Sequence, residues 1–425
     1  MRILFLLPDF PYPASTGGRL KIFNVLKQLS MRHQCDILCF GNVRDSNQAG
    51  LIEALPNVRV LGVIPPVTGI SKWAEILWNL ARGLPPSFAP FSGRKYASAL
   101  KECLAGSDYD LIHYDIINMA QYLPFGAKLP AVHSPNDATS LIYFRMAESI
   151  PWSFLKIRLQ ISAILLRRFE RKTYPCFGKI HVVSQVDAAY LMSLGVSIDV
   201  ATIPIAIDEA FLNKVEYQDG RNAALERYPR IVCNGNLGNP AIAKGVRDFV
   251  DVALPLILKK ISNVRFIVLG QNISSALQEQ LGKTSNVEFL TWVEDYRQFL
   301  ADADVVLVPD TVGPPGAKTR TLQAMGLGLP VVGTETAFAG MPFSNREHGL
   351  LYKTMPECAE LILSLLNDRK MCEDLGEKAH QLVMDEFSLS VVGPKYEKLY
   401  QEAIAKFKFH HHDRANRYKG ADSHD

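Results

Sequence analysis

The sequence predicts an α/β protein built from two doubly wound, Rossmann-like halves of nearly equal size. Short apolar runs of strand length alternate with segments in which apolar residues recur at helical spacing. This strand–helix–strand unit repeats along both halves of the chain, which is typical of parallel sheets covered by helices on both faces. The length of 425 residues suits two to three domains of ordinary size.

The first half opens with Arg2 and a continuous apolar run up to Leu7, which predicts a buried strand at 2–7 that ends at Pro8. A loop rich in Pro, Ser and Gly follows at 11–18. Residues 19–29 predict a helix, because their apolar side chains recur every three to four positions. Further strands are expected at 35–40, 58–64, 110–114, 130–133, 180–184 and 201–204.

The second half repeats this plan. Its strands are expected at 231–235, 265–270, 287–290, 304–309 and 330–334. A long helix is expected at 244–261, interrupted or bent at Pro255, and a short one at 322–325. We therefore expect one domain at 1–205, a second at 206–390, a helix at 391–408 that packs back toward the first domain, and a disordered polar tail at 409–425. Ligands of doubly wound sheets bind at the carboxyl ends of the strands, here the cleft between the halves.

The composition excludes several classes of protein. Hydrophobic residues make up 48% and charged residues 21%, so the chain is neither disordered nor fibrous nor a coiled coil. Forty-six Lys and Arg against 43 Asp and Glu give a net charge of +3, too balanced to indicate a nucleic-acid partner. We see neither a run long enough to span a membrane nor a signal peptide, and the seven cysteines contain no Cys-x-x-Cys pair. A cytoplasmic protein without disulfides or zinc is expected.

Two glycine-bearing loops are candidate anion sites. Gly17 and Gly18 stand just before a helix, where free amides and the helix dipole attract phosphate, although such a pair is also ordinary turn chemistry. The second loop, 234–240, contains Asn236 and leads to Lys244 near the start of a helix. Lys244 is equally consistent with a solvated surface lysine, because the loop matches neither a Walker A nor a dinucleotide-binding pattern.

The segment 312–332 is the most informative. A Gly/Pro loop that includes Gly316 and Ala317 leads into a short helix carrying Lys318 and Arg320. Backbone amides and two cations at the start of a helix suit a diphosphate. Gln323, farther along this helix, is placed to hydrogen-bond a sugar hydroxyl.

The stretch 322–332, Leu-Gln-Ala-Met-Gly-Leu-Gly-Leu-Pro-Val-Val, resembles the Leu-Glu-Ala-Met-Ala-x-Gly-x-Pro-Val-Val block of the family 4 glycosyltransferases of GT-B fold. The loop 316–323 is similar to that of an exopolysaccharide and sugar-transfer subgroup. Weaker similarities at 9–18, 183–184, 202–208 and 290–295 follow in the family's order and extend the resemblance over nearly the whole chain.

The resemblance implies a retaining, metal-independent, hexosyltransferase-like enzyme that uses a UDP- or GDP-linked sugar and no further cofactor. The first domain would take a saccharide or lipid-linked acceptor, and the second would hold the nucleotide sugar. By the same resemblance His133 is the catalytic histidine beside the donor sugar, although a core histidine is the alternative and His113 the rival. Gly17, Gly18, Asn236, Lys244, Gly316, Ala317, Lys318, Arg320 and Gln323 would contact the donor.

Two positions depart from the family pattern, which carries a Glu-x7-Glu pair. Pro315 and Gln323 occupy the two places, which weakens the expected contacts to the sugar and to the ribose. Two alternatives therefore stay open: a nucleotide-sugar epimerase or hydrolase of the same fold, and a catalytically degenerate protein that binds sugar nucleotides.

A last candidate lies at 150–172, where Trp, Phe and Leu side chains are mixed with six Lys and Arg residues. Such a helix is consistent with peripheral contact to the inner face of the cell membrane, as expected for an enzyme of polysaccharide or cell-envelope synthesis. A core helix with a solvated basic face is the alternative.

Overall fold

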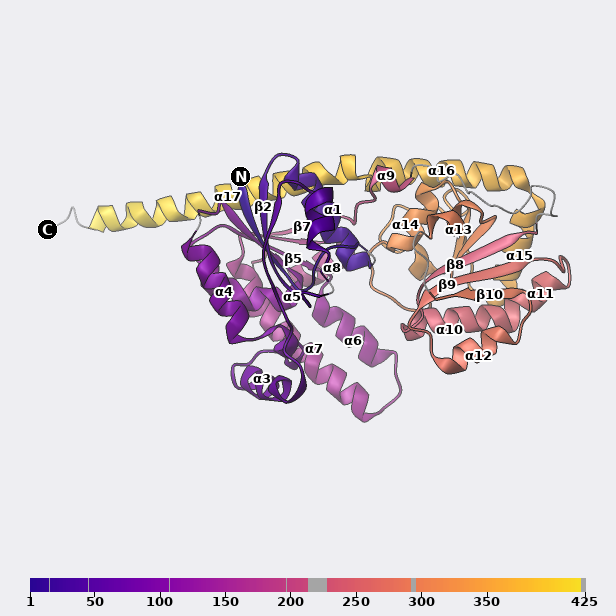
Figure 1. Cartoon of the computed structure of the whole chain (residues 1–425), viewed down its shortest axis with the longest axis horizontal. Coiled ribbons are helices and arrows are strands. Elements are labelled where there is room, and N and C mark those ends of the chain that lie inside the picture. The colour runs from indigo at the N-terminus through magenta and orange to yellow at the C-terminus, as the bar shows by residue number, and fades with distance from the viewer. Residues whose placement is uncertain are drawn as a thin grey trace. The chain divides into compact units, whose positions relative to one another are not determined.

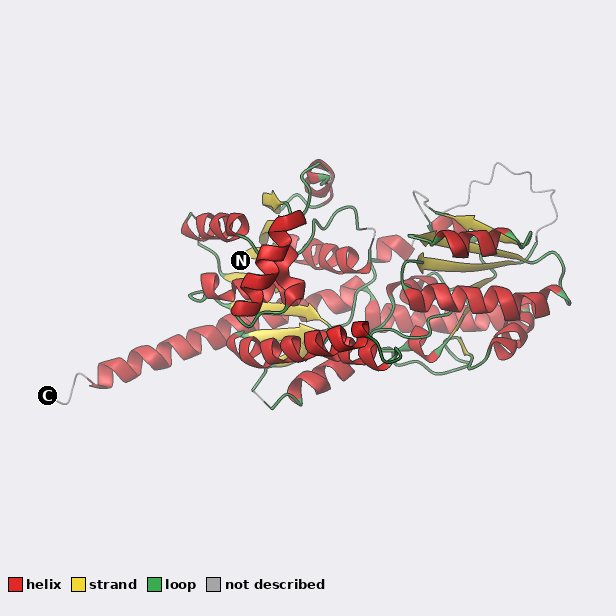
Figure 2. Cartoon of the chain, turned by 90° about the horizontal axis from the view of Figure 1, so that it is seen from below, coloured by secondary structure: helices red, strands yellow, loops and turns green. Residues whose placement is uncertain are grey.

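The computed structural model describes residues 1–14, 16–44, 46–106, 108–195, 197–212, 228–291 and 296–421, with side chains up to 409. Its contacts divide the chain into two compact units (Figure 1). Unit 1 comprises Met1–Pro204 and Val392–Asp425, and unit 2 comprises Ile205–Val391. Each unit is a parallel sheet with helices on both faces, so the predicted fold class is confirmed (Figure 2).

Unit 1 holds a seven-stranded sheet in the order β3-β2-β1-β4-β5-β6-β7, in which every neighbouring pair is parallel. The strands are β1 Arg2–Leu7, β2 Gln34–Phe40, β3 Val58–Ile64, β4 Leu111–Asp115, β5 Ala131–Asn136, β6 Lys179–Val182 and β7 Val200–Thr202. The α-helices are α1 Gly17–Ser30, α2 Gln48–Ala54, α3 Gly69–Ala81, α4 Arg94–Ala105, α5 Ile116–Met119, α6 Thr139–Glu148, α7 Phe154–Thr173 and α8 Gln185–Met192. Short 3₁₀ helices are η1 Pro86–Phe91, η2 Ala120–Gly126 and η3 Tyr174–Cys176.

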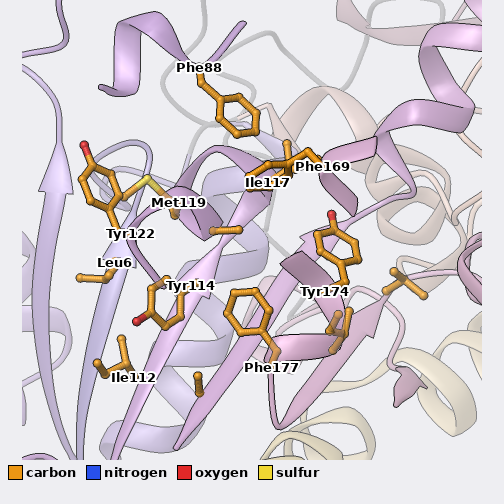
Figure 3. Packing of buried hydrophobic residues seen from close by; sticks show 14 of the residues in the cluster. Leu6, Phe88, Ile112, Tyr114, Ile117, Met119, Tyr122, Phe169, Tyr174 and Phe177 are labelled. Atoms are coloured by element: carbon orange, nitrogen blue, oxygen red, sulfur yellow. The ribbon is translucent and has the colours of Figure 1, made fainter. Parts of the chain in front are cut away.

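The two faces of this sheet bury different side chains, because successive residues of a strand point to opposite sides. Leu4 and Leu6 of β1 join an apolar cluster that also contains Tyr114 and residues of α7 and η3 (Figure 3). Phe5, between them, packs instead on the ring of His113 on the other face. That second face therefore carries His113, a buried polar side chain.

Helix α17 (Leu389–Ala421) returns the chain to unit 1. Tyr396 and Tyr400 of this helix are buried, and the Tyr400 hydroxyl lies 2.6 Å from Nδ1 of His113. The backbone stays helical to Ala421, so the expected disordered tail is wrong for residues 409–421. Lengthening an existing helix requires no new nucleus, which is why a polar segment continues it.

Unit 2 holds a six-stranded sheet in the order β10-β9-β8-β11-β12-β13, also parallel throughout. Its strands are β8 Arg230–Asn236, β9 Arg265–Gln271, β10 Val287–Leu290, β11 Val305–Val308, β12 Val331–Gly333 and β13 Leu350–Leu351. Its helices are α9 Glu209–Leu212, α10 Pro240–Asp248, α11 Leu254–Leu258, α12 Ser275–Gly282, α13 Arg297–Ala301, α14 Thr319–Gly326, α15 Met355–Asn367 and α16 Arg369–Phe387. A π-helical turn, η4 Phe249–Ala253, and a 3₁₀ turn, η5 Glu335–Phe338, complete the unit.

Successive side chains of β8 point to opposite faces of the unit 2 sheet and join two separate apolar clusters. Ile231 and Cys233 pack with residues of α10, α11 and α15, whereas Val232 packs with residues of α14 and α16. The predicted long helix at 244–261 is interrupted by η4 just before Pro255. The proline has no N–H for the helical ladder, so the preceding turn widens to accommodate it.

A buried carboxyl in unit 1 predicts a pH-dependent stability. Glu170 of α7 is fully buried and accepts hydrogen bonds from the amide of Ser140, at 3.0 Å, and from its hydroxyl. Burial raises the pKa of Glu170 to about 7. A carboxyl whose pKa is raised on folding contributes stability below its unfolded pKa, and this contribution is lost as the pH rises through 7.

We therefore expect Glu170→Gln to remove part of the fall in unfolding free energy between pH 5 and pH 8, about 1–3 kcal/mol. Urea titrations at several pH values measure this directly. Glu148→Gln, an exposed position on α6, is the control and should keep the wild-type pH profile. Parallel profiles for the wild type and Glu170→Gln would contradict the expectation.

Candidate functional site

The carboxyl edge of the unit 2 sheet brings together the ends of β8 and β11 with the starts of α10 and α14. Gly245 of α10 allows the closest of these approaches, since a Cβ there would lie 1.9 Å from the carbonyl oxygen of Pro309. Gly245 of the Lys244-Gly245 pair is therefore needed for the close packing of α10 on the end of β11. The lysine side chain is 60% exposed and pairs with Asp248 of the same helix at 2.5 Å.

Arg320 is the cation that this edge buries. Its guanidinium forms an ion pair with Asp310, and only 14% of the Arg320 side chain is exposed. One terminal nitrogen lies where a side chain at Gly235 would begin, because a Cβ there would be 2.5 Å from Nη1. Nε of Arg320 has no hydrogen-bond partner among the described residues, nor does the buried Oδ1 atom of the half-buried Asn234. A charged group whose Nε–H is unused thus lies between the end of β8 and the first turn of α14.

The loop before α14 is held from two sides. Lys318 donates from Nζ to the carbonyl oxygens of Gly316, at 2.8 Å, and Pro314. Behind the loop lies Gly340, with φ of +75°, where a Cβ would be 2.6 Å from the amide nitrogen of Ala317. No side chain caps the N-terminus of α14. The first amides of α14 therefore lack a side-chain acceptor and stand beside the Arg320 guanidinium, an arrangement that suits an anion.

The other predicted residues of unit 2 have distinct environments. Gln323 lies one turn beyond Arg320 on α14 and is 5% exposed. Asn236 ends β8, and its Oδ1 accepts from the amide of Gly238 at 2.9 Å and from Nδ2 of Asn272 at 3.2 Å. The structure thus gathers Gly316, Ala317, Lys318, Arg320 and Gln323 on one loop and helix, whereas Lys244 is solvated.

In unit 1, Gly17 and Gly18 begin α1 and are exposed. A Cβ at Gly18 would meet nothing within 4 Å, so packing does not require the glycine there. Next to them Arg19 pairs with Asp9 of the loop after β1 at 2.6 Å. The glycines leave the start of this helix accessible to a ligand.

The predicted position of His133 is wrong. Strand β5 does not end at this residue but continues to Asn136, and the pleat turns the His133 ring into the apolar cluster. The ring is fully buried, stacks on Phe177 with centroids 4.8 Å apart, and packs edge-on against Tyr174 (Figure 3 shows both aromatic residues). Nδ1 donates to the carbonyl oxygen of Tyr114 at 2.9 Å. Burial lowers the pKa of His133 to about 3, so its imidazole is neutral near pH 7.

This environment predicts that His133→Ala lowers the unfolding free energy by roughly 2–4 kcal/mol through the cavity it leaves. Turnover per folded molecule should stay near that of the wild type. Melting temperature and turnover measured on the same preparation check both statements. A stable variant with turnover reduced about 100-fold would instead restore His133 to a catalytic role.

The opposite face of the same strands holds a charged cluster that the sequence did not reveal. Lys21 of α1 is 2% exposed and donates to Asp115 Oδ1 at 2.8 Å, to Asn136 Oδ1 at 2.6 Å and to the Ser134 hydroxyl. Burial would raise the pKa of Asp115, but Lys21 and His113 lower it to about 2. Nε2 of His113, the rival candidate, lies 3.8 Å from Asp115 Oδ1.

Backbone strain marks the same edge. Asn136, with φ of 70°, and Ile116, with φ of 51°, adopt left-handed conformations where β5 and β4 end. A left-handed conformation costs free energy, most of all for a β-branched residue such as Ile116, and residues in strained conformations are common at functional sites. One sequence signal could have identified Lys21. It lies four residues before Val25, so helical spacing places it on the face of α1 that the apolar residues bury. The carboxyl edge of unit 1 is therefore built around Lys21, Asp115 and Asn136.

Within the described residues no three His, Cys, Asp or Glu side chains gather as metal ligands do, and whether the protein needs a metal stays a prediction. No helix in the described part of the chain is long and apolar enough to cross a membrane.

Two family models match the chain over most of its length. The model described as Glycosyltransferase Family 4 matches residues 22–211, and the model described as Glycosyl transferases group 1 matches residues 228–368. Residues 292–295, which belong to one of the similar stretches noted in the sequence, lie outside the described residues.

A curated relative is the lipopolysaccharide core biosynthesis glycosyltransferase LpsE of Rhizobium meliloti, 27% identical over 125 residues. The match spans 29% of this chain and 36% of that protein, so only about a third of the relative's length is compared.

Solved structures resemble the whole chain. Sucrose-phosphate synthase from Thermosynechococcus elongatus has a TM-score of 0.71 at 16% identity, covering 95% of this chain and 100% of that one. The Anabaena protein HepE in complex with UDP-glucose has a TM-score of 0.64 at 18% identity, covering 94% and 98%. At such identities these similarities concern the fold, which they share over nearly its full length.

Proposed function

The chain belongs to the family 4 glycosyltransferases of GT-B fold, and on this premise we propose that it transfers a sugar, with retention of configuration, from a nucleotide diphosphate sugar. The acceptor is a saccharide or a lipid-linked saccharide, and the product is a polysaccharide or glycan of the cell envelope. The solved complexes of HepE with UDP and with UDP-glucose support this class of donor. The partial similarity to a lipopolysaccharide core enzyme supports this class of acceptor.

One observation carries the proposal: the largely buried Arg320 guanidinium, whose Nε–H is unused, beside the uncapped start of α14. A guanidinium offers five donors in a rigid fork that matches the oxygens of a phosphate. The departing nucleotide diphosphate gains negative charge as the bond to the sugar breaks, and Arg320 with the amides of α14 would stabilise that charge. Gln323, one turn farther along, would accept from a ribose hydroxyl through its amide oxygen.

Lys318 contributes indirectly in this account. Its ammonium holds two loop carbonyls, and so keeps the amides of Gly316 and Ala317 in place for the donor. We expect Lys318→Met to weaken donor binding by about tenfold, because the loop must then be ordered by the ligand. Calorimetric titration of the nucleotide measures the change. Lys353→Met, an exposed lysine of the same unit, is the control, and equal affinities in both variants would make Lys318 a surface charge.

The proposal is tested by incubating the full chain with a panel of UDP- and GDP-sugars in the presence of EDTA. We expect release of nucleoside diphosphate from one donor, and proton NMR of the product should show the donor's anomeric configuration. Inversion of that configuration would contradict retention. Activity that is lost in EDTA and restored by magnesium or manganese would contradict metal-independence.

A further inference from the structure

Helix α3 exposes its apolar side chains and buries a polar one. Ile70 is 89% exposed, Trp73 is 70% exposed, and Leu77, Trp78 and Leu80 are exposed as well. Most of these residues are spaced three or four apart and line one side of the helix. The one buried residue of α3 is Asn79, on the opposite side. This is the reverse of the usual arrangement for a surface helix, in which the apolar side faces the core.

Polar contacts hold α3 in this orientation. Nδ2 of the Asn79 side chain donates to the Ser92 hydroxyl at 3.0 Å. The Ser92 hydroxyl lies 3.0 Å from the side-chain oxygen of Gln121. Rotating α3 to bury its tryptophans would break this buried network, at the cost of unsatisfied polar groups. The apolar side is therefore fixed toward the surface.

Helix α7 also exposes apolar side chains, in its first half. Trp152, just before the helix, is 76% exposed and Phe154 is 82% exposed. Ile157, Ile161 and Ile164 continue the exposed row along the helix. The buried row of the same helix, which includes Leu159, Ala163 and Leu166, points the other way. An apolar stripe thus lies outward although α7 already has an apolar face against the core.

The two helices belong to the same side of unit 1. α3 packs on η1, and Phe88 of η1 meets Phe169 of α7 with ring centroids 4.9 Å apart (Figure 3). Both helices lie at the lower side of the unit in Figure 1. We call the exposed apolar side chains of α3 and of the segment 152–164, taken together, the apolar face.

The charges around the apolar face are mainly positive. Residues 139–173 contain seven Lys and Arg against two Glu, an excess larger than the net charge of the whole chain, +3. One of the two glutamates, Glu170, is buried. On α3 Lys72 and the C-cap residue Arg82 stand against Glu75, and α7 carries Lys156, Arg158, Arg167 and Arg168.

We propose that the apolar face docks onto an anionic lipid bilayer. Tryptophan side chains favour the boundary between headgroups and acyl chains, and the surrounding cations attract anionic headgroups. The apolar stripes would enter the interfacial layer of the bilayer, while the polar contacts of Asn79 hold the opposite side of α3 against the rest of unit 1. This proposal does not depend on the donor, and it would hold the protein at the membrane whichever acceptor it uses.

Vesicle flotation with the full chain tests the proposal. Wild-type protein should float with vesicles of phosphatidylcholine and phosphatidylglycerol at 7:3, and at least tenfold less with pure phosphatidylcholine or in 0.5 M salt. The emission of its tryptophans should shift to shorter wavelength on the anionic vesicles.

Two double variants probe the two stripes: Trp73→Ser with Leu77→Ser on α3, and Trp152→Ser with Phe154→Ser at α7. Each should lose at least tenfold in flotation with an unchanged melting temperature, because the replaced side chains are exposed. Val252→Ser, an exposed apolar residue of unit 2, should float like the wild type.

Three outcomes would overturn the proposal. One is wild-type protein that fails to float with anionic vesicles. The second is flotation that both double variants retain in full. The third is a lipid-free dimer, seen by sedimentation velocity, that both double variants abolish, since the apolar face would then bind a second copy of the chain.

Discussion

Replacing Arg320 with alanine is expected to weaken donor binding about 100-fold. A charge-assisted hydrogen bond contributes about 1.5–3 kcal/mol, and 2.8 kcal/mol corresponds to roughly a factor of 100 in affinity. Nε of Arg320 carries one N–H without a partner in the described part of the chain, so at least one such bond is open to the donor. Calorimetric titration with the nucleoside diphosphate measures the loss.

Loss of binding must be distinguished from loss of stability, since Arg320→Ala leaves Asp310 buried and unpaired and so destabilises the protein. The double variant Arg320→Ala with Asp310→Asn removes both charges and should restore much of the stability without restoring affinity. Arg320→Lys keeps a charge without the fork and should lie between wild type and alanine. Arg247→Ala, exposed on α10, is the matched control. Wild-type affinity in the stable double variant would remove Arg320 from the site.

Lys21→Met is expected to destabilise the protein by about 3–5 kcal/mol, the usual cost of removing one partner of a buried ion pair. Asp115 would be left charged and buried, and the acceptors of Ser134 and Asn136 would lose the same donor. Urea denaturation measures the change. Lys95→Met, an exposed lysine of α4, should have almost no effect.

A double-mutant cycle with Asp115→Asn identifies the cause. The pair Lys21→Met with Asp115→Asn should be less destabilised than the sum of the single variants, because it leaves no unpaired charge. Since the folded pKa of Asp115 is about 2, its stabilising contribution is complete above its unfolded pKa and lost as the pH falls through 2. Additive effects of the two substitutions would show that Lys21 and Asp115 do not interact.

The sequence predicted the fold well because parallel strands buried on both faces read as continuous apolar runs, as in β1 and β11. It also predicted the loop and helix around Arg320, where glycines, prolines and cations occur together within a few residues. Helix ends were less predictable, since the π-turn before Pro255 and the continuation of α17 depend on local hydrogen bonding.

The site in unit 1 was harder to predict because its members are far apart in the sequence. His133 was placed at a strand end, but the structure extends β5 by three residues and the pleat points its ring into the core. Lys21 interacts with residues 94 to 115 positions away, a contact that no local pattern encodes. The exposed stripe of α3 has ordinary helical spacing, and only the burial of Asn79 reveals which side faces the core.

Binding of a nucleotide diphosphate sugar by unit 2 at the start of α14 is the step on which the proposed function depends. The most direct measurement is the melting temperature of the full chain with a panel of UDP- and GDP-sugars in EDTA, since a ligand that binds the native state stabilises it. We expect at least one donor to raise the melting temperature of the wild type and not that of the Arg320→Ala, Asp310→Asn variant. No shift with any donor, or an equal shift in both proteins, would contradict it.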